Sequence, residues 1–130
     1  MTENSRAALL GTAAAAATIA AALLLSKPAA REFLGALLGV TAGVYLGFGL
    51  LDGRPRELRI EVAGILLFLG LAVLGLKVWP YFLAAGFFLH GLWDAAHHAR
   101  GVKTRIVDLW RPSCLAYDWL VSAFIVAWWR

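Results

Sequence analysis

Five apolar runs restrict what this chain can fold into more than any other feature of its sequence. They cover residues 7–25, 33–51, 60–79, 81–98 and 113–129, and short polar or basic connectors separate them. A helix needs about 20 apolar residues to cross a bilayer, and unpaired backbone groups are too costly in lipid for other conformations. The runs therefore predict an all-α, polytopic integral membrane helical bundle: one membrane domain, residues 1–130, with five transmembrane helices.

The composition supports a bilayer as the solvent and the main partner of this chain. Hydrophobic residues make up 62% of it and charged residues 15%, whereas a soluble domain is usually about half apolar and a quarter charged. A chain of 130 residues is too small to hide so much apolar surface in its own core. The net charge of +4 comes from basic residues in the connectors, which fits anionic lipid headgroups. No nucleic-acid partner is expected.

The first run allows two interpretations. It is rich in alanine from Ala7 to Leu25 and ends at Ser26-Lys27-Pro28. A basic start, an apolar stretch and small residues also describe a signal peptide, whose removal would leave four spans. Its length favours a retained helix, as does the position of Ala29-Ala30 beyond a lysine and a proline.

The distribution of basic residues predicts the orientation. With a cytoplasmic N-terminus, eight basic residues lie at the inner end of a five-span bundle and four at the outer end. The inner group is Arg6, Arg54, Arg56, Arg59, Arg100, Lys103, Arg105 and Arg111, and the outer group is Lys27, Arg31, Lys77 and Arg130. The positive-inside rule therefore predicts a multi-pass protein of the inner (cytoplasmic) membrane with its N-terminus in the cytoplasm.

The second run carries a glycine at every fourth position, which puts Gly35, Gly39, Gly43 and Gly47 on one helix face. Such a face lets another helix approach closely. Packing within the monomer is the favoured interpretation. A homodimer, or docking on a larger membrane complex as an accessory subunit, stays open.

Polar residues inside the fourth and fifth runs predict a functional site. His90, Asp94 and His97 follow i, i+4, i+7 spacing on one helix face, and Asp118 enters from the same end of the bundle. A charge in a span costs about 2.5–3.5 kcal/mol, so such residues need a reason. Because they converge from several helices, we expect a site in the cytoplasmic half, to which Glu61 can add a carboxylate.

A metal ion is the first chemistry that this pattern indicates. Imidazole and carboxylate groups on adjacent helical turns suit a transition metal such as zinc or iron. The predicted metal ligands are His90, Asp94, His97 and His98.

Acid–base catalysis on a lipid-like small molecule is the second chemistry. His90, Asp94 and Asp118 would be the catalytic groups, and Trp93 and Tyr117 would bind the cofactor or substrate. Whether the protein is an enzyme stays open at this stage.

Two further alternatives remain. His90 and Asp94 could form a proton path in a small transporter. Asp94 and His97 or His98 could instead pair with basic residues and clamp the last two helices together, through Arg100, Arg105 or Arg111. Cys114 is the only cysteine, so no intrachain disulfide is possible. The thiol is expected to be inert, although it could join a mixed metal site.

Two segments resemble a family of small bacterial multi-span membrane proteins of unknown function. The first is His90-Gly91-Leu92-Trp93-Asp94-Ala95-Ala96-His97-His98, which is similar to a His-x-x-Trp-Asp-x-x-His-His pattern. The second is Trp110-Arg111-Pro112-Ser113-Cys114-Leu115-Ala116-Tyr117-Asp118, which is similar to Trp-x-Pro-x-Cys-x-x-Tyr/Phe-Asp. The resemblance covers about the last 50 residues. It implies that these residues cluster, and it implies no particular activity.

Overall fold

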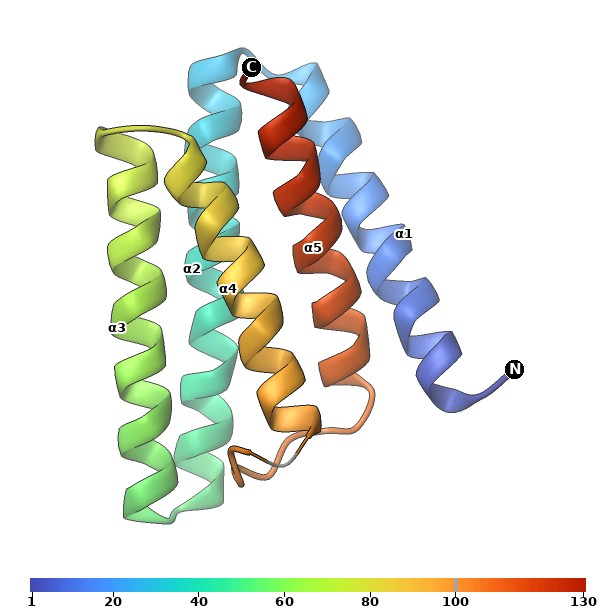
Figure 1. Ribbon diagram of the computed structural model, residues 1–130, viewed down its shortest axis with the longest axis vertical. Helices are drawn as coiled ribbons and strands as arrows, with labels where there is room; N and C mark the ends of the chain where they lie inside the picture. The colour runs from blue at the N-terminus through green and yellow to red at the C-terminus, as the bar shows by residue number, and fades with distance from the viewer. Residues whose placement is uncertain (100) are drawn as a thin grey trace.

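A computed structural model of the protein describes residues 1–99 and 101–130, and its helices form one elongated bundle (Figure 1). The helices are α1 (Glu3–Leu24), α2 (Lys27–Asp52), α3 (Pro55–Lys77), α4 (Tyr81–His98) and α5 (Trp110–Trp128). Within the described ranges there is no strand. The all-α prediction is confirmed.

The connectors contain the residues that stop one helix and start the next. Ser26 caps α2 by accepting a hydrogen bond from the backbone of Ala29. Gly53 ends α2 with a φ of 74°, a left-handed conformation that suits glycine, and α3 starts directly after it with Pro55. The N-terminus, this α2–α3 turn and the α4–α5 loop lie together at one end of the bundle (Figure 1).

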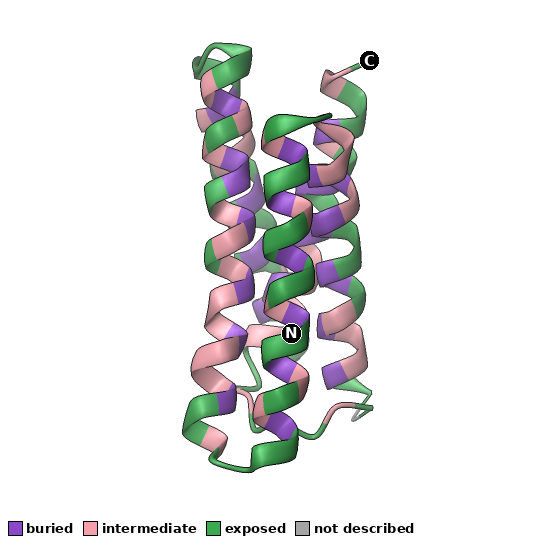
Figure 2. Cartoon of the chain, turned by 90° about the vertical axis from the view of Figure 1, so that its left-hand side faces the viewer, coloured by how far each residue is buried: buried purple, intermediate pink, exposed green. Residues whose placement is uncertain are grey.

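The core lies between α4, α5 and the helices that pack against them. α5 packs between α1 and α4, α4 also contacts α3 and α2, and α2 packs along α3. The buried residues form stripes that face inward, and the exposed residues face outward (Figure 2). The core cluster draws large apolar side chains from α2, α4 and α5, among them Leu34, Leu38, Leu83, Phe87 and Val121.

Three helices, not five, are long and apolar enough to cross a membrane by their own composition. These are α1, α2 and α3. The runs predicted at 81–98 and 113–129 do form helices, but α4 and α5 are not apolar enough to meet the same criterion. α4 holds His90, Asp94, His97 and His98, and α5 holds Arg111 and Asp118. The polar residues that predict a site are thus the ones that lower the hydropathy of these two helices.

The glycine face of α2 is only partly used inside the chain. A Cβ added at Gly35 would press on the side chain of Leu76 in α3, with a nearest approach of 2.8 Å. At Gly43 and Gly47, an added Cβ would meet no described atom within 4 Å. The tightest backbone approach lies elsewhere, because a Cβ at Gly11 of α1 would overlap the carbonyl of Ser113 in α5.

Candidate metal centre

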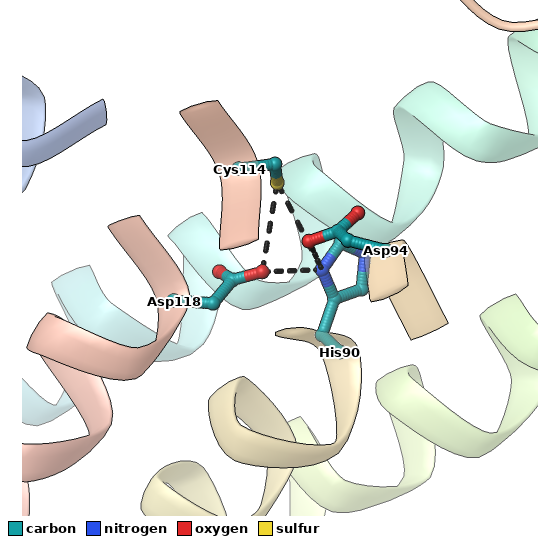
Figure 3. A group of neighbouring side chains, drawn as sticks. All are labelled: His90, Asp94, Cys114 and Asp118. Atoms are coloured by element: carbon teal, nitrogen blue, oxygen red, sulfur yellow. Dashed lines mark hydrogen bonds and ion pairs between the residues drawn. The ribbon is translucent and has the colours of Figure 1, made fainter. Parts of the chain in front are cut away.

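Four buried side chains from α4 and α5 meet in the interior of the bundle. They are His90, Asp94, Cys114 and Asp118, and one ligand atom from each lies within 4.8 Å of the others (Figure 3). His90, Asp94 and Asp118 have no exposed surface, and Cys114 is 5% exposed. Such a group of donors could hold a metal ion.

Helical spacing and close packing bring the four together. His90 and Asp94 are four residues apart, as are Cys114 and Asp118, so each pair lies on one face of its helix. The two helices pack together, and Gly91 of α4 leaves room for a side chain of α5, because a Cβ at Gly91 would overlap the indole of Trp119. The site is therefore built on two rigid helices rather than on a loop.

The central contact joins His90 to Asp118. The Nδ1 atom of His90 lies 2.6 Å from Oδ2 of Asp118 and 3.7 Å from Oδ2 of Asp94. The Cys114 thiol lies 3.5 Å from Oδ2 of Asp118 and 3.9 Å from the same His90 nitrogen. Tetrahedral coordination with bonds of about 2.1 Å sets ligand atoms about 3.4 Å apart, so these separations are close to a coordination shell. The His90–Asp118 distance is the exception and is that of a hydrogen bond.

Polar atoms around this group are left without partners. His90 Nε2, Asp94 Oδ2 and Asp118 Oδ1 are buried and have no hydrogen-bond partner among the described residues. Buried polar atoms are nearly always hydrogen-bonded, because an unpaired one loses its hydrogen bonds to water and gains none in the protein. Of the three, Asp94 Oδ2 lies 3.7 Å from Nδ1 of His90, so it is available as a ligand atom in this group.

Tyr45 of α2 is a member of the site that the sequence prediction missed. Its hydroxyl donates a hydrogen bond to Oδ1 of Asp94, and its ring makes an edge contact with the ring of His90, with centroids 5.4 Å apart. Tyr45 is 2% exposed. The one sequence feature that could have indicated this role is that Tyr45 is a lone tyrosine in the middle of the apolar, glycine-rich second run.

His97 belongs to a second cluster, one turn farther toward the end of the bundle. Its Nε2 lies 2.8 Å from Oε1 of Glu61, and its Nδ1 donates to the carbonyl of Trp93 at 2.8 Å. Glu61 also accepts hydrogen bonds from the hydroxyl of Thr104 at 2.5 Å and the indole of Trp93 at 3.3 Å. Both ring nitrogens of His97 thus face acceptors, which requires a proton between His97 and Glu61. Glu61 is therefore a buried hydrogen-bonding partner of His97.

The remaining predicted site residues lie elsewhere. His98 is exposed at the end of α4. Trp93 takes part in the Glu61 cluster, and the Tyr117 hydroxyl lies 3.2 Å from the hydroxyl of Thr18 in α1. The structure therefore brings together His90, Asp94 and Asp118, adds Cys114 and Tyr45, and separates His97 and His98 from them.

The predicted arginine clamp takes a different form. Arg111 donates to the backbone carbonyl of His97 at 3.2 Å, not to a side chain of the site, and pairs with Asp108 at 2.5 Å. Arg54 pairs with Asp52, whose hydrogen-bonded carboxylate raises the pKa of the guanidinium. Arg100 lies outside the described residues.

A family model matches residues 6–129 of the chain. The protein belongs to DUF6010, a family of unknown function. The match includes both segments on which the resemblance was based, and it also covers the alanine-rich and glycine-rich helices that the resemblance left out. No curated protein and no solved structure matches the chain. For this DUF6010 member, function has to be inferred from the site itself.

Proposed function

We propose that this protein is a multi-span membrane protein that binds a transition-metal ion, zinc or iron, at His90, Asp94, Cys114 and Asp118. The observation that carries the proposal is the convergence of four buried donor atoms within 4.8 Å of one another. The unpaired Oδ2 atom of Asp94, which lies 3.7 Å from Nδ1 of His90, supports it.

The charge of the group favours a cation. Asp94 and Asp118 are both fully buried, and a carboxylate in an apolar interior is costly unless a positive charge or a proton neutralises it. Among the described residues, no lysine or arginine pairs with either of them. A divalent cation would compensate both carboxylates at once.

The donor set narrows the choice of metal. One imidazole nitrogen, two carboxylate oxygens and one thiol form a mixed set of the kind that zinc and iron accept, and a set that magnesium and calcium do not favour. Asp94 would bind through Oδ2, because Tyr45 occupies its Oδ1. Such outer contacts commonly orient a metal ligand. On binding, the ion would take the place of the proton that His90 Nδ1 shares with Asp118.

The arrangement of the helices supports five spans with an intramembrane site. α5 packs between α1 and α4, and α4 packs against α3, so α4 and α5 run beside helices that are apolar enough to span (Figure 1). Both also expose large apolar side chains outward, such as Phe88 and Leu92 on α4 and Leu120 and Val126 on α5. Their polar residues face inward, as expected for charged groups within a bilayer. We infer the N-terminus to be cytoplasmic from the basic residues at that end.

The test is the metal content of protein purified in detergent, measured by inductively coupled plasma mass spectrometry. About one zinc or iron per chain is expected for the wild type. We expect that metal to be lost in His90→Ala and kept in His98→Ala, which removes an exposed histidine from the same helix. A metal-free wild type from metal-supplemented cells would refute the proposal, as would equal metal content in the two variants.

Acid–base chemistry on a lipid-like small molecule is the second candidate, and the His90–Asp118 hydrogen bond favours it. An imidazole held 2.6 Å from a carboxylate is a common arrangement for proton transfer. This candidate predicts metal-free protein that co-purifies with an apolar compound, detectable by mass spectrometry of an organic extract. The compound should be lost on Asp118→Asn and kept on Asp108→Asn.

A further inference from the structure

The α4–α5 loop is held in place by residues of the neighbouring helices. Arg54 donates to the carbonyl of Lys103 at 2.6 Å, and Asp52 accepts from the backbone N–H of Arg105 at 2.8 Å. Thr104, between them, is buried and donates to Glu61 at 2.5 Å. The loop is thus anchored through its backbone and one small side chain, although it has no regular secondary structure.

This anchoring leaves the long basic side chains of the loop available. Among the described residues, neither the Lys103 ammonium nor the Arg105 guanidinium makes a hydrogen bond or an ion pair; only their backbone atoms are engaged. Both side chains line a cavity of about 510 Å³, with His97 at its inner wall and Arg111 at the start of α5.

The cavity is a positively charged environment. Three cationic side chains line it, against one carboxylate, Asp108, which is 88% exposed and pairs with Arg111. The Nε atom of Arg111 is buried and has no partner among the described residues, so this guanidinium has an unused donor. α5 begins at Trp110 without a side-chain cap, and the positive end of its dipole lies at the same place.

We propose that this cavity binds a phosphate group. A phosphate offers several strong acceptor oxygens and two negative charges, which match the two free cations and the unused guanidinium donor. The cavity opens at the end of the bundle that carries most of the basic residues, where anionic headgroups lie if the helices span. The phosphate could come from a lipid headgroup or from a free phosphate.

The position of His97 connects this cavity with the interior. Its ring lines the cavity wall and lies against the ring of Tyr45, with centroids 4.6 Å apart, and Tyr45 in turn bonds to Asp94. A phosphate-bearing molecule held here would therefore lie next to the polar core. The phosphate site does not depend on a metal at His90, because the two sites share no residue.

The first arm of the test is a titration of detergent-purified protein with inorganic phosphate, followed by ³¹P nuclear magnetic resonance. The informative variant is Lys103→Gln with Arg105→Gln, which leaves the anchoring backbone contacts in place. The matched control is Arg56→Gln with Arg59→Gln, which removes the same charge from exposed positions at the same end. We expect the first pair to weaken binding by about tenfold or more and the control by less than about twofold.

The second arm identifies a lipid source. Protein reconstituted in phosphatidylcholine vesicles containing phosphatidic acid is released and examined by native mass spectrometry. Phosphatidic acid retained by the wild type and control but lost from Lys103→Gln/Arg105→Gln would support a headgroup site. Selective loss in the first arm, with no phosphatidic acid retained by the wild type, would support a free-phosphate site. No binding in either arm overturns the proposal, and so does equal weakening in both variant pairs.

Discussion

His90 Nδ1 lies 2.6 Å from Oδ2 of Asp118, and this contact links α4 to α5 in the interior of the bundle. The two residues are 28 positions apart, so the contact exists only because the two helices pack face to face. Its loss should therefore affect both the stability of the bundle and the chemistry of the site.

Asp118→Ala is expected to destabilise the protein by about 1–3 kcal/mol, because it leaves the buried His90 without its partner. Thermal unfolding in detergent, followed by circular dichroism in metal-free buffer, measures the effect. Asp108→Ala is the control, since Asp108 is 88% exposed and its ion pair with Arg111 should contribute less than about 1 kcal/mol. Equal losses of stability would show that the His90–Asp118 contact does not stabilise the interior.

Tyr45→Phe should weaken metal binding by about 10–100-fold while keeping the ring that packs on His90. The reason is that the Tyr45 hydroxyl orients Asp94 and leaves its other oxygen facing the site. Competition with a chromogenic chelator measures the affinity. Tyr81→Phe, at the start of α4, should change nothing; an unchanged affinity in Tyr45→Phe would remove Tyr45 from the site.

Glu61→Gln should destabilise the bundle by about 1–3 kcal/mol without changing metal content. The substitution removes the charge that His97 faces, whereas the His90 group is left intact. A double-mutant cycle with His97→Gln should give a coupling energy of about 0.5–3 kcal/mol. Metal lost from Glu61→Gln at unchanged stability would mean that the two clusters form one site.

Two glycine substitutions should have opposite effects on stability. Gly11→Ala is expected to cost about 1–3 kcal/mol, because its Cβ would overlap the Ser113 carbonyl. Gly43→Ala should stabilise the monomer by about 0.5–1 kcal/mol, since alanine is the better helix former and no described atom lies within 4 Å. Thermal unfolding of the two variants provides the comparison, and a destabilised Gly43→Ala would contradict it.

Gly43→Leu extends this comparison to association. If the open part of the α2 glycine face binds a second copy of the chain, the bulky side chain should shift the protein to a monomer in analytical ultracentrifugation. Gly70→Leu on α3, another glycine with no described atom within 4 Å of an added Cβ, is the matched control. A wild type that is already monomeric would rule out a homodimer through this face.

Local pattern was enough to predict where the helices lie. Apolar runs and their proline- and glycine-containing connectors are local features, and every predicted run is a helix. Local spacing also put His90 and Asp94 on one face. The single thiol of Cys114 was expected to be inert or to join a mixed metal site, and the structure places it in the group that could hold a metal ion.

Of the four predicted metal ligands on α4, His90 and Asp94 lie in the group that could hold a metal ion, whereas His97 contacts Glu61 and His98 is exposed. His90 and His97 are seven residues apart, which separates their Cα atoms by about 10 Å along a helix. A compact site needs donors from a facing helix, and which helix faces α4 is not encoded in the pattern of α4 alone. His97 meets Glu61 of α3, whereas His90 meets Asp118 of α5.

The sequence by itself determined the all-α architecture, the concentration of basic residues at one end and the polar faces of α4 and α5, because each depends on residues close together in the chain. Only the tertiary structure decided which polar faces meet. It paired His97 with Glu61, added Tyr45 and Cys114 to His90 and Asp94, and left His98 exposed. The physical reason is that helix packing depends on where small residues leave room for a neighbour, as Gly11 does for the backbone of Ser113 and Gly91 for the indole of Trp119, and that depends on both partners of each contact.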